Sequence, residues 1–305
     1  MSDDQESLEP ARPEPARLHR DYTKGSLAAG IASLATPMAA DQVATSLYRI
    51  VDLYFLGRLG PVVLAASSLG SMVVFAALTA GLGIAVAGLA VVARRVGEKD
   101  YDGAAHAIWQ VLMLGAILGL GLGAVGAVLA RPVLALLGAT GEVLDQGTLY
   151  LRMTSLLLAP LVLNFTINRA LRGAGEAKLA LWTMAVGSGL SVLLTPVLIL
   201  GWGPVPALGI VGSAVASATG HGLGLTLALG ALATGRHRIT LRLATARPDL
   251  ALWSHLAKIG APVTGQLLLR STSRLVLAPL IASFGPAALA AYGIMVRVMM
   301  FPLSI

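Results

Sequence analysis

The sequence predicts an all-α membrane protein, a polytopic bundle of helices, and three observations support this prediction. The 305 residues are 56% hydrophobic and 12% charged, with a mean hydropathy of +0.79, whereas soluble chains are about a quarter charged. Apolar runs of roughly 20 residues, the length that crosses a bilayer, recur along the chain. Lys and Arg gather mainly at the ends of these runs. Together these features argue against a soluble fold.

Eight apolar runs are predicted to be membrane-spanning helices. They lie near residues 27–57, 62–93, 104–130, 147–168, 179–202, 207–234 and 256–283, and from 286 to the end. The first 24 residues mix both charges with proline and contain no apolar segment. We therefore expect residues 1–25 to be a disordered cytoplasmic tail rather than a signal peptide.

The distribution of basic residues predicts the orientation. Of the 22 Lys and Arg residues, 15 fall in the N-terminal tail and in the loops after the second, fourth and sixth runs. Because cytoplasmic loops carry the excess of positive charge, we expect a multi-pass protein of the cell inner membrane with a cytoplasmic N-terminus. Three fall on the opposite side, and four lie inside predicted spans: Arg49, Arg270, Arg274 and Arg297.

Composition and spacing argue against several other functions. A net charge of +7 would favour nucleic-acid binding only if the basic residues shared one solvated face, and here they flank apolar runs. The chain has no Cys, and its His residues form no ligand cluster, so neither a metal site nor a cofactor is expected. A membrane enzyme would need polar loops with catalytic carboxylates, and the loops are short. We expect no enzyme and no nucleic-acid partner.

An internal repeat at an offset of 225 residues predicts the architecture. The first copy has Pro37 followed by "GPVVLAA" from Gly60, and the second has Pro262 followed by "GPAALAA" from Gly285. The alternative is a chance match between two Ala- and Leu-rich segments. Because six spans separate the copies, they keep one orientation, as in parallel repeats related by an axis along the membrane normal.

The repeat divides the chain into lobes. We expect a complete six-helix N-terminal lobe at residues 26–235, a cytoplasmic interlobe linker at 236–255, and the start of a C-terminal lobe at 256–305. That second lobe would hold only its first one to two helices. The sequence ends inside the hydrophobic stretch "VRVMMFPLSI". We therefore expect a chain that is truncated relative to a twelve-helix design.

Five segments together resemble a known family. They are Pro37 with Gln42, then "VDLYFLGRLGPVVLAA", "GLGIAVAGLAVVARRVGEKDYDGAAHA", "NRALRGAGEAKLALW" and "LTPVLILGWGPVPALGIVGSAVAS". In this order and spacing they are similar to the multidrug and toxic compound extrusion (MATE) transporters. The resemblance covers residue 27 to the end, and the joint occurrence of five segments is more specific than any one of them.

The resemblance implies a secondary active efflux transporter. Two six-helix lobes would work by alternating access, and H⁺ or Na⁺ antiport would drive the export of drugs or organic cations without another cofactor. We expect the full-length protein to be monomeric in the lipid bilayer, with a small-molecule substrate. The alternative is a lipid-linked oligosaccharide flippase or exporter of the same broader superfamily, in which arginines inside the membrane would suit an anionic headgroup.

Asp52 is the strongest candidate for a cation-coupling residue. A charged side chain at membrane depth costs about 2.5 to 3.5 kcal/mol on insertion scales, so it usually faces a cavity or a partner. In the family, the acid of the "VD" pair lies in the N-lobe cavity, and some members use it in cation coupling. The alternative is an ion pair with Arg49, since residues three apart share a helix face.

Three more residues of the first run are candidates. Asp41 lies eleven residues before Asp52, about three helical turns, so both acids are expected on one face. Gln42 matches the family pattern and is expected to line the cavity or to pack between helices. Pro37 removes a backbone hydrogen bond inside the helix, which permits a bend of the kind by which the family is thought to reshape its cavity. The alternatives are interhelical hydrogen bonding for Asp41 and a static kink at Pro37.

The chain also departs from the family pattern. Many members carry an Asn and an Asp in the fifth helix, where Ser191 and Thr195 stand here. The two-acid cavity of some prokaryotic members is therefore incomplete. In the seventh helix, Arg270 occupies the position of a family Glu, and Arg274 lies one turn later. We hypothesise an intramembrane charge network that joins Arg49, Arg270 and Arg274 to the acids of the first helix. The alternative for Arg270 and Arg274 is an interface with lipid headgroups.

Overall fold

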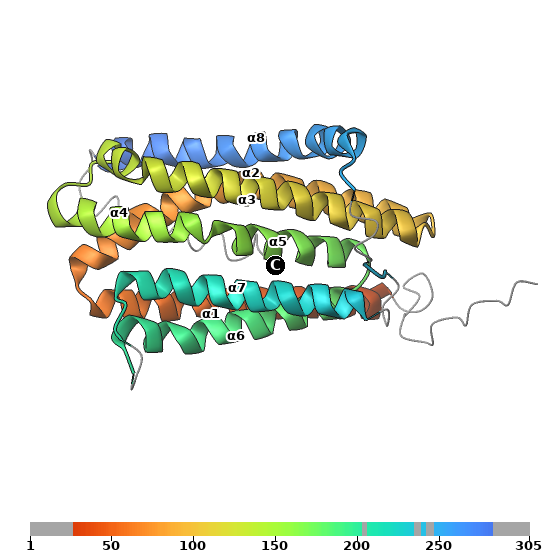
Figure 1. The fold of residues 1–305 in the computed structure, drawn as a ribbon, viewed down its shortest axis with the longest axis horizontal. Helices are drawn as coiled ribbons and strands as arrows, with labels where there is room; N and C mark the ends of the chain where they lie inside the picture. Colours follow the sequence, from red (N-terminus) through yellow and green to blue (C-terminus); the bar gives the residue numbers. More distant parts are fainter. Residues whose placement is uncertain (1–26, 203–205, 235–238, 242–246, 283–305) are drawn as a thin grey trace, which may run out of the picture.

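The computed structural model describes residues 27–202, 206–234, 239–241 and 247–282, and this part of the chain forms eight α-helices packed in one bundle (Figure 1). They are α1 (Leu27–Arg58), α2 (Pro61–Gly97), α3 (Tyr101–Leu136), α4 (Gly141–Leu156), α5 (Leu158–Gly173), α6 (Ala177–Leu200), α7 (Ile210–Ala233) and α8 (Leu250–Ala282). The predicted all-α bundle is confirmed. Helices cover the first seven apolar runs, and the eighth lies outside the described residues.

The connections alternate between the two ends of the bundle, as Figure 1 shows. The α1–α2, α3–α4 and α6–α7 connections lie at one end, and the α2–α3 and α5–α6 connections lie at the other with the start of α8. The second end carries the basic residues on which the orientation was predicted. We call it the basic end and define it by Arg94, Arg95, Lys99, Arg172 and Lys178.

Length and apolar character suit a membrane. Among the described residues, α2, α3, α6 and α7 are each long and apolar enough to cross a bilayer, and α4 with α5 qualifies as one bent span. The turn from α1 to α2 follows the predicted Gly-Pro signal. Gly60 adopts φ +112°, which favours glycine, and Pro61 occupies the first helical position, where its missing N–H costs nothing.

The fourth predicted span is two helices rather than one. α4 ends at Leu156 and α5 begins at Leu158, with a bend of 48° between them. Pro160 explains the break, since its ring excludes the carbonyl four residues earlier, that of Leu156, and it has no N–H to donate there. The position of the bend is therefore set by one proline at the start of α5.

Glycines of α3 pack against the bend between α4 and α5. A Cβ at Gly119 would lie 2.8 Å from the Cα of Ala159, and a Cβ at Gly126 would lie 2.7 Å from the Oγ of Ser155. Gly123, between them, faces the Ser155 carbonyl more closely still. The absence of side chains at these three positions lets the backbone of the bend rest on α3, as small residues do between membrane helices.

The start of the predicted second lobe packs against the first lobe. α8 contacts α2 and α3, and the backbones of Gly83 and Gly260 meet where α2 and α8 cross. At the basic end, the buried amide of Gln110 on α3 donates to the Arg247 carbonyl at 2.5 Å. The same amide oxygen accepts from the Asp249 N–H at 3.0 Å and from the Trp253 indole at 2.7 Å. Gln110 thereby anchors the chain that enters α8, which begins six residues before the predicted run.

Candidate functional site

Asp52 lies between α1 and α7 and accepts a short hydrogen bond. The Ser213 hydroxyl of α7 donates to its Oδ1 at 2.5 Å. Ser213 is 2% exposed, and Asp52 is half-buried. The ion pairs in the described part of the chain join other residues, and Arg49 is exposed. The structure therefore shows no Asp52–Arg49 ion pair, because the Asp52 carboxylate faces the Ser213 hydroxyl instead.

A second pair of polar side chains faces across the same two helices. Tyr48 precedes Asp52 by one helical turn, and Ser217 follows Ser213 by one turn, so each pair shares a face of its helix. The hydroxyl groups of Tyr48 and Ser217 lie near each other. The two pairs, Asp52–Ser213 and Tyr48–Ser217, form two rungs of facing polar groups between antiparallel helices, and the Asp52–Ser213 rung is a hydrogen bond. We refer to them as the α1–α7 ladder.

Tyr150 of α4 lies beside the ladder. Its ring is buried, and its hydroxyl lies 3.2 Å from the Ser71 hydroxyl of α2. A Cβ at Gly70 would meet this ring at 2.5 Å, so a glycine admits the tyrosine. An apolar cluster that includes Leu56, Ile199 and Ile210 packs around the same tyrosine. The Asp52–Ser213 and Tyr150–Ser71 pairs thus bring oxygen atoms of four helices into one apolar region.

The other predicted site residues lie apart from this arrangement or outside the description. Gln42 is half-buried on α1. Pro37 lies within α1, but its side chain and that of Asp41 are outside the described residues. The side chains of Arg270 and Arg274 on α8 are outside them too. In Figure 1, α8 lies along one edge of the bundle, and α1 lies with α6 and α7 toward the opposite edge. The charge network stays a prediction.

Ser191 and Thr195 are buried where α6 packs on α7. The Ser191 hydroxyl donates to the Gly187 carbonyl at 3.1 Å, and the Thr195 hydroxyl donates to the Ser191 carbonyl at 2.7 Å. Both acceptors belong to α6 itself. Gly220 of α7 leaves the room that the Ser191 hydroxyl occupies. At these two positions, where the family pattern has an Asn and an Asp, the hydroxyls satisfy the backbone of their own helix.

Sequence reasoning missed a buried amide network between α5, α6 and α7. Asn164 donates to the His221 carbonyl at 3.0 Å, and Asn168 donates to the Asn164 carbonyl at 2.8 Å. Thr183 donates to the Asn168 side chain at 3.0 Å. Asn164 and Asn168 are four residues apart in an apolar run, the spacing of one helix face, and that spacing was a usable signal. The network links α5 to α6 and α7.

The ladder partners of Asp52 were missed as well. Ser213 and Ser217 show the same spacing of four in "GSAVAS", which places two hydroxyls on one face of an apolar helix. Chemically, carboxylate and hydroxyl oxygens are ligands for hard cations, and a carboxylate also takes up a proton. Among the described residues, no group of three or more His, Asp or Glu side chains could hold a metal ion.

The chain is similar in sequence to known export proteins. A family model described as MatE matches residues 37–197, more than half of the chain. The multidrug export protein MepA of Staphylococcus aureus (strain MRSA252) is 28% identical over 268 residues, which are 87% of this chain and 58% of that protein. MepA of Staphylococcus haemolyticus is 24% identical over 282 residues, which are 92% of this chain and 62% of that protein. The chain thus spans about three fifths of the length of these curated relatives.

Solved structures agree in fold. The crystal structure of a MATE point mutant superposes with a TM-score of 0.81 at 25% identity, over 90% of this chain and 61% of that one. A MOP superfamily transporter from Pyrococcus furiosus, described as having a binding pocket of reverse polarity, gives a TM-score of 0.79 at 27% identity, over 90% and 60% of the two chains. The chain belongs to the MatE family, the multidrug and toxic compound extrusion transporters.

Proposed function

We propose that this chain supplies the first lobe of a cation-coupled antiporter that exports drugs or organic cations. Family membership and the printed function of the relatives, multidrug export, support a transporter rather than an enzyme. Export would proceed by alternating access between two six-helix lobes, of which this chain holds the first and the start of the second. Either H⁺ or Na⁺ would serve as the coupling ion.

The observation that carries the proposal is the environment of Asp52. Its carboxylate is half-buried in an apolar bundle and is held by a hydroxyl rather than by a cationic side chain among the described residues. A carboxylate that is removed from water is costly to keep charged, so the uptake of a cation offsets that cost. The hydroxyls of Ser213 and Tyr150 add oxygen atoms from two other helices.

Ion binding at Asp52 can be coupled to helix movement because the neighbouring oxygen atoms belong to different helices. Asp52 lies on α1, Ser213 on α7 and Tyr150 on α4, so a cation taken up at Asp52 changes the balance of forces among three helices. A coupling ion can shift a conformational equilibrium only through different affinities for the two states. We propose that the α1–α7 ladder differs between the states and that Asp52 thereby links ion binding to the direction in which the cavity opens.

Replacement of Asp52 tests the proposal. In the full-length protein, Asp52→Asn keeps the size of the side chain and removes the charge that would bind the coupling ion. We expect efflux of the cationic dye ethidium from cells to fall to the level of cells that lack the transporter, with unchanged amounts of protein in the membrane. Asp52→Glu, which keeps the charge, should retain part of the activity.

Asp145→Asn is the matched control. Asp145 is an exposed acid of α4 that pairs with Arg131 at 2.9 Å, away from the ladder. This variant should transport at the wild-type rate. Ethidium efflux that survives Asp52→Asn would contradict coupling at this residue. In everted vesicles, separate pH and Na⁺ gradients then identify the coupling ion, and an Asp52→Asn protein should respond to neither gradient.

A further inference from the structure

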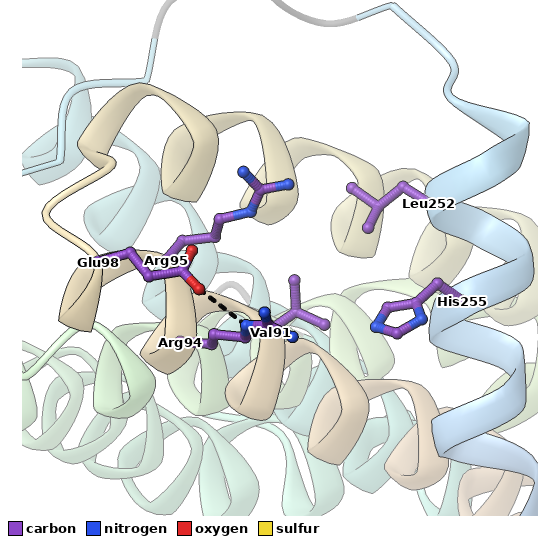
Figure 2. A pocket seen from close by; sticks show the side chains of 6 residues that line it. All are labelled: Val91, Arg94, Arg95, Glu98, Leu252 and His255. Carbon is purple, nitrogen blue, oxygen red and sulfur yellow. Dashed lines mark hydrogen bonds and ion pairs between the residues drawn. The ribbon is translucent and has the colours of Figure 1, made fainter.

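A cavity of about 280 Å³ opens between α2 and α8 at the basic end (Figure 2). Arg94, Arg95 and Glu98 line it from α2 and the residues that follow, and His255 lines it from α8. Figure 2 shows Arg94, Arg95 and the apolar Val91 on one wall and His255 with the apolar Leu252 on the opposite wall. The cavity lies far from Asp52, at the other end of the bundle, so its occupancy is a separate question from ion coupling.

The two arginines keep unused hydrogen-bond donors. Arg94 donates through Nε to Glu98 at 2.9 Å, and Arg95 donates through one terminal nitrogen to Asp100 at 2.7 Å. Among the described residues these are the hydrogen bonds that their side chains make. A guanidinium carries five N–H donors, and its paired terminal nitrogens fit the oxygens of a phosphate. The side chains of Arg94 and Arg95 are 77% and 45% exposed, so a ligand can reach them.

The charges around the cavity leave a positive excess. Two further cations lie beside the lining residues, because Lys99 follows Glu98 and Lys258 lies one turn after His255. Both lysines are exposed. The acids of the α2 wall, Glu98 and Asp100, each already accept from an arginine. Asp249, before Leu252 in the chain, accepts from the Leu252 amide and lies 3.5 Å from His106. The two arginines and two lysines therefore outnumber the three acids, and each of these acids already has a partner.

The place of the cavity suits a ligand with a charged head. Val91 belongs to the apolar cluster at the basic end of the bundle, so the cavity has an apolar side at Val91 and Leu252 and a charged side at Arg94, Arg95 and Glu98. The α2 helix is apolar enough to cross a membrane and ends at Gly97, beside Arg94 and Arg95. Basic pockets between membrane helices at this depth are the kind of site that holds anionic lipid headgroups.

We infer that the cavity between Arg94, Arg95 and His255 binds a phosphate group, either the headgroup of an anionic phospholipid or a soluble phosphate. The terminal nitrogens of Arg94 and Arg95 that their ion pairs leave unused donate to the phosphate oxygens. The volume is close to that of the smaller ligand pockets and has ample room for one phosphate group.

Two variants that break the same ion pair test the inference. Arg94→Gln removes a phosphate donor, whereas Glu98→Gln removes a negative charge from the cavity wall. Both delete the Arg94–Glu98 pair. The full chain is titrated with inorganic phosphate in detergent, and the shift of the thermal unfolding midpoint gives the apparent affinity. We expect Arg94→Gln to weaken phosphate binding about tenfold, the effect of one lost charge-assisted hydrogen bond, and Glu98→Gln to keep or strengthen it.

The matched control is Arg131→Gln at the opposite end of the bundle. Arg131 pairs with the exposed Asp145 at 2.9 Å and lines no described cavity, so its loss should leave phosphate binding unchanged. Equal losses in Arg94→Gln and Glu98→Gln would mean that the ion pair is merely structural, and this result would overturn the inference. An equal loss in Arg131→Gln would overturn it too, since the binding would then be non-specific.

Nanodiscs distinguish the two sources of phosphate. The wild-type midpoint is compared in phosphatidylglycerol and in phosphatidylcholine, which differ in net charge. A higher midpoint in phosphatidylglycerol that Arg94→Gln abolishes and Arg131→Gln retains identifies a lipid headgroup. Stabilisation by inorganic phosphate in phosphatidylcholine with the same dependence identifies a soluble phosphate. If neither probe raises the midpoint of the wild-type chain, the cavity binds no phosphate.

Discussion

At the scale of single residues, the hydroxyl partner of Asp52 decides what the acid can do. Ser213 is buried and donates at 2.5 Å, so it fixes the direction in which the carboxylate faces. Tyr48 and Ser217 face each other one turn deeper in the bundle. The carboxylate is thereby presented to α7 and α4 rather than to Arg49 on its own helix.

Removal of this hydroxyl should impair coupling. Ser213→Ala deletes a hydrogen bond to a charged group, worth about 1.5 to 3 kcal/mol. We expect the concentration of coupling ion that gives half-maximal dye efflux to change at least about threefold in the full-length protein. Ser217→Ala, which leaves the Asp52 carboxylate with its donor, should change it much less. Equal effects of the two substitutions would show that the ladder is only structural.

At the scale of the helices, glycines set how closely the elements approach. α3 carries Gly119, Gly123 and Gly126 against the bend between α4 and α5, and α2 meets α8 at Gly83 and Gly260. In a membrane, apolar burial does not drive helices together, so such close contacts supply much of the packing energy. These glycines therefore act as structural contacts rather than as flexible points.

Alanine at Gly123 tests this packing. The added methyl group would collide with the Ser155 carbonyl, and overpacking of this kind costs about 1 to 3 kcal/mol. We expect a lower thermal unfolding midpoint for Gly123→Ala in detergent. Gly121, two residues away on α3, is exposed, and a methyl group added there would meet nothing within 4 Å, so Gly121→Ala should be neutral or slightly stabilising. Equal midpoints for the two variants would count against the contact.

The start of α3 gives a prediction about pH. Asp100 caps this helix, since the Gly103 N–H donates to it at 2.8 Å and Arg95 donates at 2.7 Å. The Gly103 amide, and then Arg95, hold the pKa of Asp100 below its usual value of 3.8. Because the pKa is lowered in the folded state, the cap stabilises α3 fully above that value and is lost as pH falls through the lower, folded pKa.

Hydrogen exchange at the amides of residues 101–103 measures this cap. We expect their protection in the wild-type chain to decline as the pH is lowered below 3.8, beyond the intrinsic pH dependence of exchange. Asp100→Asn can still accept from the amide and should keep much of the protection without the pH dependence. Asp100→Ala should lose protection at neutral pH. A wild-type profile that matches Asp100→Asn would contradict the role of the charge.

At the scale of the whole molecule, α8 is fixed to the first lobe at two levels. Gln110 holds the chain that enters α8 at the basic end, and the Gly83–Gly260 crossing holds the helix further along. The predicted boundary at residues 236–255 stays untested as a division between lobes. These contacts imply that the first part of α8 moves with the first lobe.

Spin labels can test that rigidity, because the chain has no native Cys to remove. Labels at Asp102→Cys on α3 and Ser254→Cys on α8 should give the same distance distribution with and without a transported drug in the full-length protein. Gln110→Leu should broaden it, because three partly buried hydrogen bonds are lost. The pair Trp182→Cys and Leu227→Cys, on α6 and α7, provides a fixed internal standard. A distance that changes with drug alone would show that α8 belongs to the moving part.

The sequence predicted the helices and the candidate acid better than it predicted their contacts. Apolar runs predict spanning helices because the bilayer sets their length. Helices cover seven of the runs, with Pro160 breaking one of them, and among the described residues α2, α3, α6, α7 and the bent α4–α5 pair are long and apolar enough to cross a bilayer. Asp52 stood out because a charge inside an apolar run is costly. Its partner Ser213 lies 161 residues away, and the local pattern does not say which helix faces α1. Gln110 was missed for the same reason.

The α1–α7 ladder has a further geometric consequence. Its donors and acceptors are spaced by one turn on both helices, so a slide of α1 by about 5.4 Å would bring Asp52 opposite Ser217. The chemistry of that contact would be the same, carboxylate to serine hydroxyl. A rotation of α1 about its own axis, by contrast, would break both rungs at once. The ladder therefore opposes rotation of α1 about its own axis more strongly than it opposes a slide of α1 along that axis.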